Sequence, residues 1–251
     1  MAIVICLILF CLACYLAYSS VKHGNRERMR ELIEWANANE ISAEVLPRSP
    51  RALKKLELLD LSQHTEIETL PMSIGSLSNL RELNLYRCKK ISVLPSSIRN
   101  LTNLESLCLS CSFENLPDWM EDLSHLKLLE IGYCDNLTRL PDTFASLTNL
   151  EVLIIKYCNK LEEIPEWLGE FSFLRDLRIV SCENLASLPE NIGDLHNLKT
   201  MDLSGCHALT YLPHNIGDLE NLESFVGSAT LSRIIADRLP ACKIHYSPIF
   251  K

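Results

Sequence analysis

The chain has 251 residues, of which 47% are hydrophobic and 22% are charged, and its formal net charge at pH 7 is −8. This is enough apolar material for one elongated domain. A domain this acidic is poorly suited to a phosphate backbone, which requires clustered lysine and arginine, so the charge argues against nucleic acid as a partner.

Residues 1–21 contain no charged side chain and are almost entirely apolar. As a helix, 18 to 21 residues span about 27–32 Å, enough to cross a bilayer core. Basic residues follow the run rather than precede it, which favours an uncleaved anchor with the downstream domain in the cytoplasm. The alternative is a signal peptide cut near Ala17-Tyr18-Ser19, which would give a secreted or periplasmic ligand-binding or effector protein.

The segment 22–55 is predicted to join this anchor to the main domain. Residues 25–38 have helical spacing of apolar side chains, with Met29, Leu32 and Ile33 on one face. We expect this helix to cap the first unit of the domain, and Pro47 and Pro50 to mark the hinge that follows. The competing interpretation is a helix lying on the membrane surface beside the anchor.

Residues 56–228 repeat one pattern, with leucine or isoleucine at the first, fourth and sixth positions, usually cysteine at the ninth and Leu-Pro or Ile-Pro near the end. The alternating positions predict a short strand with one buried face, and the later spacing of three predicts helical turns on the opposite side. The first residues of successive repeats are 24 residues apart, except for one interval of 22. They are Leu56, Leu80, Leu104, Leu126, Leu150, Leu174, Leu198 and Leu222.

A fixed period of this length is typical of a solenoid, in which neighbouring units bury each other's leucines. The pattern resembles the leucine-rich repeat family over Leu56 to Leu222, and is most similar to the repeats of plant disease-resistance proteins and of bacterial and Ras-scaffold-type proteins. The resemblance implies an α/β solenoid, a curved horseshoe of about eight repeats with a parallel sheet on its concave side, preceded here by the transmembrane helix. It also implies a non-catalytic module that binds another protein.

Two parts of the repeat array are predicted to depart from the regular pattern. Repeat 3 is two residues shorter between its strand and Leu116-Pro117, so its turn must tighten. After Leu222 the pattern decays, and residues 229–251 are expected to form a carboxy-terminal cap of one helix and one strand.

The cysteines are interpreted as core residues. Five occupy the ninth repeat position, where parallel side chains about 4.8 Å apart cannot form disulfides. They are Cys88, Cys134, Cys158, Cys182 and Cys206. A thiol- or metal-dependent sensor at Cys108 and Cys111 is the weaker alternative. The common hydrolase, metalloprotease and nucleotide-binding motifs are absent, so neither catalysis nor a cofactor is expected.

The outward strand positions differ from repeat to repeat and are predicted to bind a protein partner. Tyrosine and arginine are typical of binding hot spots. We expect stacked rings, an apolar floor and a positive rim on a mainly acidic domain, which would attract an acidic partner surface. Trp167 is expected on the convex side and thus away from this surface. The predicted binding residues are Tyr86, Arg87, Glu130, Tyr133, Ile154, Lys156, Tyr157 and Arg178.

Overall fold

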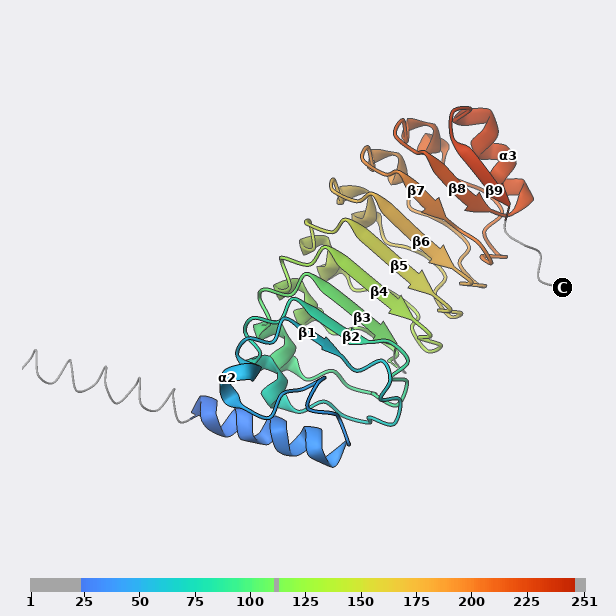
Figure 1. The fold of residues 1–251 in the computed structure, drawn as a ribbon. Helices are drawn as coiled ribbons and strands as arrows, with labels where there is room; N and C mark the ends of the chain where they lie inside the picture. The colour runs from blue at the N-terminus through green and yellow to red at the C-terminus, as the bar shows by residue number, and fades with distance from the viewer. Residues whose placement is uncertain (1–23, 111–112, 247–251) are drawn as a thin grey trace, which may run out of the picture.

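The computed structural model describes residues 24–110 and 113–246 (Figure 1). Over these residues one parallel sheet runs the length of the molecule, and its nine strands follow one another in chain order. This confirms the predicted leucine-rich repeat solenoid. The strands are β1 (Leu58–Asp60), β2 (Glu82–Leu85), β3 (Ser106–Ser110), β4 (Leu128–Gly132), β5 (Val152–Lys156), β6 (Asp176–Val180), β7 (Thr200–Asp202), β8 (Ser224–Gly227) and β9 (Lys243–Tyr246).

The register of the sheet follows the sequence repeat. Leu83 pairs with Leu107 across β2 and β3, at a spacing of 24 residues, whereas Leu107 pairs with Leu129 at a spacing of 22. The two-residue deletion therefore leaves the strands in register and is absorbed in the turn after β3. After that turn the usual spacing of three between buried residues returns. Phe113 is buried three residues before Leu116, just as Ile91 lies three residues before Leu94.

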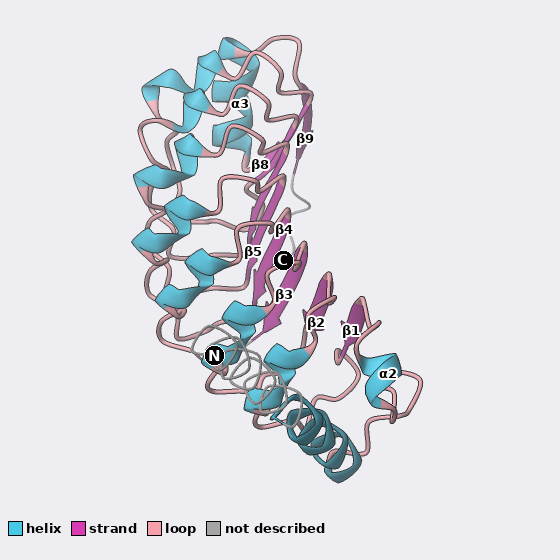
Figure 2. Cartoon of the chain, turned by 90° about the vertical axis from the view of Figure 1, so that its left-hand side faces the viewer, coloured by secondary structure: helices cyan, strands magenta, loops and turns pink. Residues whose placement is uncertain are grey.

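Short 3₁₀ helices form the opposite side of the solenoid. Their three residues per turn match the apolar spacing of three, and six of the seven begin after a proline, whose missing N–H is tolerated there. Figure 2 shows the sheet on the inner side of the bend and these helices on the outer side. They are η1 (Met72–Ser76), η2 (Ser96–Asn100), η3 (Asp118–Asp122), η4 (Asp142–Ser146), η5 (Glu166–Glu170), η6 (Ile192–Asp194) and η7 (His214–Asp218).

A single apolar core lies between the sheet and the 3₁₀ helices and runs through every repeat. Leu107, Leu153 and Leu177 are each at most 1% exposed, because each packs between the rungs on either side. Trp167 also belongs to this core: it is 5% exposed and its ring lies 5.9 Å from that of Phe144. Trp167 is therefore on the convex side, as expected, but it is not a surface residue.

Both ends of the described chain carry a cap. The helix over residues 24–38 buries Met29 and Leu32 against the first repeat, and the Trp35 indole N–H donates to the Thr69 carbonyl at 3.0 Å. The short α2 (Pro50–Leu53) follows it. At the other end, α3 (Ala229–Arg238) starts at Ser228, whose hydroxyl accepts the Leu231 N–H, and β9 completes the sheet.

The predicted transmembrane segment, residues 1–21, lies outside the described residues. Within 24–110 and 113–246, no helix is both long enough and apolar enough to cross a bilayer. The domain limits suggested by the sequence, 1–21, 22–55, 56–228 and 229–251, stay predictions.

Two ladders of side chains connect neighbouring repeats. The second repeat position carries charges that mostly alternate in sign, and adjacent members pair: Arg81 with Glu105, Glu105 with Lys127 at 2.8 Å, and Lys199 with Glu223 at 2.8 Å. At the last position, an asparagine amide donates to a backbone carbonyl 25 residues earlier, at 2.6–2.8 Å. These asparagines are Asn79, Asn103, Asn149, Asn197 and Asn221.

The cysteine column is buried, as predicted, and none of its five thiols forms a disulfide. Several thiols donate to the carbonyl of the sixth-position residue one repeat earlier, as Cys206 does to Ile179 at 3.1 Å and Cys88 to Leu61 at 3.3 Å. Burial raises the pKa of Cys88 to about 11. The thiol thus fills a tight turn and satisfies a carbonyl without being ionised.

Replacing Cys158 with serine should destabilise the protein by about 1–3 kcal/mol, measured by urea unfolding. The Cys158 sulfur lies 3.5 Å from the Lys156 carbonyl oxygen and 4.0 Å from that of Ile131. These separations suit sulfur but leave the shorter serine hydroxyl unsatisfied. Cys108→Ser is the control, because Cys108 is half-buried on the sheet face and should tolerate the change better. Rapid thiol labelling of native Cys158 and Cys182 would contradict the assignment.

Candidate protein-binding surface

In repeats 2, 4, 5, 6 and 7 the eighth position, which follows the strand, adopts a left-handed backbone. Four residues other than glycine do so, with φ of 53–67°: Arg87, Tyr133, Tyr157 and Ser181. Gly205, at φ 74°, is the one residue at this position whose type indicates the conformation. Left-handed residues with a Cβ carry strain of about 1–3 kcal/mol each and gather at functional sites, so this row is a candidate for function.

Backbone hydrogen bonds hold this position rigidly. The Tyr133 N–H donates to the Lys156 carbonyl at 2.8 Å, and the Tyr157 N–H donates to the Val180 carbonyl at 3.0 Å. The sheet ladder is thereby extended by one bond beyond β4 and β5. Side chains at the eighth position consequently keep the spacing of the strands themselves.

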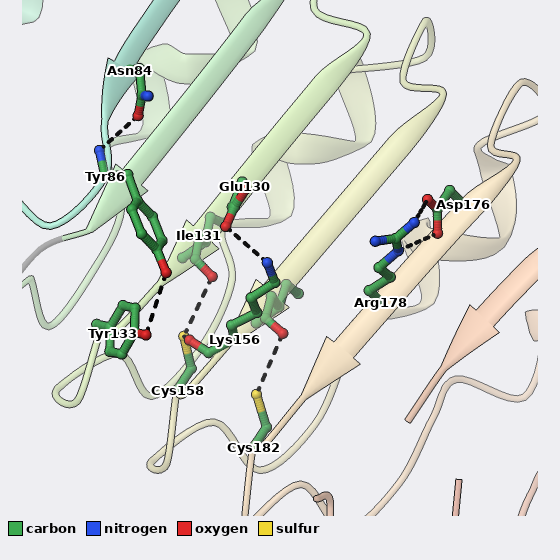
Figure 3. Close-up of polar contacts among 11 residues, drawn as sticks. Asn84, Tyr86, Glu130, Ile131, Tyr133, Lys156, Cys158, Asp176, Arg178 and Cys182 are labelled. Carbon is green, nitrogen blue, oxygen red and sulfur yellow. Dashed lines mark hydrogen bonds and ion pairs between the residues drawn. The ribbon is translucent and has the colours of Figure 1, made fainter. Parts of the chain in front are cut away.

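Three tyrosines form a cluster on this edge of the sheet, which we call the tyrosine cluster (Tyr86, Tyr133 and Tyr157). The rings of Tyr133 and Tyr157 stack with centroids 4.6 Å apart and planes 16° from parallel, which confirms the predicted stacking. Tyr86 meets Tyr133 edge-on, at 5.7 Å and 64°, and its hydroxyl donates to the Tyr133 hydroxyl at 3.3 Å (Figure 3).

Tyr86 reaches Tyr133 although a whole repeat lies between them. The seventh position, which Tyr86 occupies in its own repeat, is Ser110 in the next repeat and Gly132 in the one after. These small residues leave room for the ring, and a Cβ at Gly132 would lie 3.7 Å from the Tyr86 Cε2 atom. The two small residues can be read from the sequence, but their relation to Tyr86 is visible only once the repeats are aligned by position.

Two cations lie beside the tyrosine cluster. The Lys89 ammonium is 4.3 Å from the centroid of the Tyr133 ring, and the Arg87 guanidinium carbon is 5.7 Å from that of Tyr86. Both are within the range of cation–π attraction. Lys89 was not among the predicted binding residues, because its place above a ring depends on how the turn folds back.

The prediction that Lys156 and Arg178 give the surface a positive rim is wrong. The Lys156 ammonium lies 3.2 Å from the Glu130 carboxylate, and Arg178 donates two bonds to Asp176, at 2.7 and 3.0 Å (Figure 3). Glu130 and Asp176 therefore neutralise both cations. The centre of the concave face is a paired polar network, and the cations that lie next to the rings are Arg87 and Lys89.

The apolar floor is partly covered. Ile154 is only 8% exposed, and Val152 and Leu128 beside it are half-buried. Of the predicted binding residues, Tyr157 is the most accessible aromatic, at 39% exposure. The protruding part of the surface is consequently the tyrosine cluster, and the strand centres act mainly as its support.

The thiol-sensor alternative finds no support at Cys108. Chiefly through burial, with Glu130 adding to the effect, the pKa of Cys108 rises to about 11, so its reactive thiolate is scarce at neutral pH. Cys111 lies outside the described residues. Within the described part of the chain, no three His, Cys, Asp or Glu side chains gather as a metal site would require.

The pKa of Tyr86 should be measurable as about 12, well above the ordinary 10, chiefly because its proton is held in the bond to Tyr133 and secondarily because of burial. A pKa raised by folding stabilises the protein below pH 10, and this contribution should disappear between about pH 10 and 12. Absorbance titration of the phenolates would follow it.

Tyr133→Phe should return the Tyr86 pKa toward 10, whereas Tyr211→Phe, at a tyrosine that is 51% exposed, should leave it unchanged. Titration of Tyr86 together with the exposed tyrosines in the unmodified protein would contradict the hydrogen bond.

Comparison with known proteins supports the repeat assignment. A family model described as a leucine-rich repeat region matches residues 37–131. The comparison with curated protein sequences found no match. Among solved structures, the Arabidopsis receptor kinase HAESA in complex with the peptide hormone IDA and the co-receptor SERK1 is similar at 22% identity and a TM-score of 0.51. The match covers 71% of this chain and 31% of that one.

Two further solved structures are also similar. A leucine-rich repeat protein of Leptospira interrogans is 26% identical, with a TM-score of 0.40, and the match covers 74% of this chain and 59% of that one. The leucine-rich repeat domain of the type III effector XopL is 21% identical, with a TM-score of 0.41, and the match covers 92% and 93% of the two chains. The family match identifies residues 37–131 as a leucine-rich repeat region, and the same strand–turn–3₁₀ repeat and sheet register continue beyond it.

Proposed function

We propose that the chain is a non-catalytic recognition module that binds another protein across its concave surface, with the tyrosine cluster as the anchor. The observation that carries this proposal is the stack of Tyr133 and Tyr157, held by backbone hydrogen bonds on a strained turn. Rigid, partly exposed tyrosines supply a large contact area at little entropic cost, which is why they dominate many interfaces.

The remaining predicted binding residues have supporting roles in this proposal. Arg87 borders the rings and offers a charged contact at the edge of the surface. The pairs Lys156–Glu130 and Arg178–Asp176 present both signs of charge, so they select a partner by charge pattern rather than by net attraction. Ile154 adds a small apolar area between them.

The similarity to HAESA is consistent with this proposal but concerns the fold alone. That structure contains a bound peptide hormone and a co-receptor, and it shows that a leucine-rich repeat solenoid can hold protein ligands. The present chain spans less than a third of that protein, so the identity of its partner stays open to experiment.

Tyr133→Ala combined with Tyr157→Ala should weaken binding of the partner by about 2 kcal/mol or more, roughly thirtyfold, because both anchoring rings are removed. The partner would be isolated from the source organism with the unmodified chain and identified by mass spectrometry, and its affinity measured by calorimetry.

Tyr211→Ala is the matched control, since it also removes an exposed tyrosine, at 51% exposure, but lies outside the cluster. Unchanged affinity in the double variant, together with lost affinity in Tyr211→Ala, would contradict the proposed surface.

We propose further that residues 1–21 anchor the module in a membrane, on the basis of their uncharged sequence and the basic residues after it. The full-length chain should stay with membranes after a high-salt or alkaline wash, whereas a chain starting at Arg26 should be soluble and folded. Recovery of a mature chain beginning at Ser20 in the soluble fraction would favour the secreted alternative instead.

A further inference from the structure

The stack of rings ends at Tyr157. One face of the Tyr157 ring is covered by Tyr133, at a centroid separation of 4.6 Å. Tyr157 nevertheless remains 39% exposed as a residue, whereas Tyr133, which contacts both Tyr157 and the Lys89 ammonium, is half-buried. Because the strands follow chain order, the face of the Tyr157 ring opposite Tyr133 lies on the side of the next repeat.

The next repeat has the backbone for another ring but not the side chain. Ser181 occupies the same eighth position and has the same left-handed conformation as Tyr157, with φ of 53° against 54°. Its N–H continues the ladder by donating to the Ser204 carbonyl at 2.7 Å. The rung beside Tyr157 is thus fixed at strand spacing and carries only a hydroxymethyl group.

The repeat after that also lacks a ring. Gly205 holds the eighth position there, and a Cβ on it would meet the Ser181 Oγ at 2.7 Å, so this rung packs closely against Ser181. Ser181 and Gly205 have small side chains or none, so they leave the space beside the Tyr157 ring unfilled by a ring of this chain. A planar group placed above Ser181, one strand spacing from Tyr157, would have its face against the ring.

We infer that the open face of Tyr157 is a subsite for an aromatic side chain of the protein partner, which continues the stack above Ser181. This inference rests on the proposed concave-surface function and adds the chemistry of the residue that is bound. Stacking prefers an aromatic ring to an aliphatic chain because paired rings attract beyond their buried area, so an aromatic residue should bind about two- to tenfold better than an aliphatic one.

The test uses the full-length chain with ¹³C-labelled tyrosine and N-acetyl-tryptophanamide as the probe, with N-acetyl-leucinamide as the aliphatic control. The tryptophan amide should cause a saturable upfield shift of the Tyr157 ring protons that the leucine amide does not reproduce. Tyr211, which is 51% exposed, reports non-specific contact with the probe. Equal shifts at Tyr157 and Tyr211, or no saturable shift at Tyr157, would overturn the inference.

Ser181→Tyr fills the subsite from within the chain, because the backbone there already has the conformation of Tyr157. This variant should abolish the probe-induced shift, whereas Ser181→Ala should retain it and shows that a change at this position is tolerated. Persistence of the shift in Ser181→Tyr would place the probe elsewhere and overturn the inference.

The isolated partner separates this inference from the proposed function. If it requires Tyr133 and Tyr157 yet binds Ser181→Tyr with unchanged affinity, the surface is correct and the aromatic subsite is wrong. If it ignores all of these substitutions, the proposed surface itself is wrong.

Discussion

Each rung of this solenoid depends on its neighbours for its backbone hydrogen bonds, because the strands pair in parallel and only with the rungs beside them. Parallel pairing at a fixed register places equivalent repeat positions next to each other. Every residue type that recurs in the sequence therefore becomes a column in space. The leucines form the core, the cysteines fill the turns, the asparagines bind backbone carbonyls, and the tyrosines stack.

Much of this architecture could be predicted from the repeat alone. Alternating leucines indicate the strands, the spacing of three indicates the 3₁₀ helices, and the stacking of Tyr133 on Tyr157 follows from their shared position. The left-handed turn could not be predicted, because among the residues at that position only Gly205 has a type that favours it. The pairing of Lys156 with Glu130 was also missed, since it depends on which way two long side chains extend.

The irregular third repeat contributes directly to the candidate surface. The small residue Ser110 of this repeat, together with Gly132 of the next, leaves room for Tyr86 to reach Tyr133. These small side chains allow side chains from repeats 2, 4 and 5 to form one aromatic surface, and the strained left-handed turns hold it in place.

The charge ladder has a consequence for how such a chain can change in evolution. From Arg81 to Arg175 the second position alternates in sign at every repeat. Loss of repeat 3 alone would set Arg81 against Lys127, whereas loss of repeats 3 and 4 together would set Arg81 against Glu151 and preserve attraction. Each surface pair contributes only about 0–1 kcal/mol, but like charges in contact oppose the rearranged stack. Gain or loss of two repeats at a time therefore preserves the attractive pairs in this part of the solenoid, whereas gain or loss of one repeat places like charges side by side.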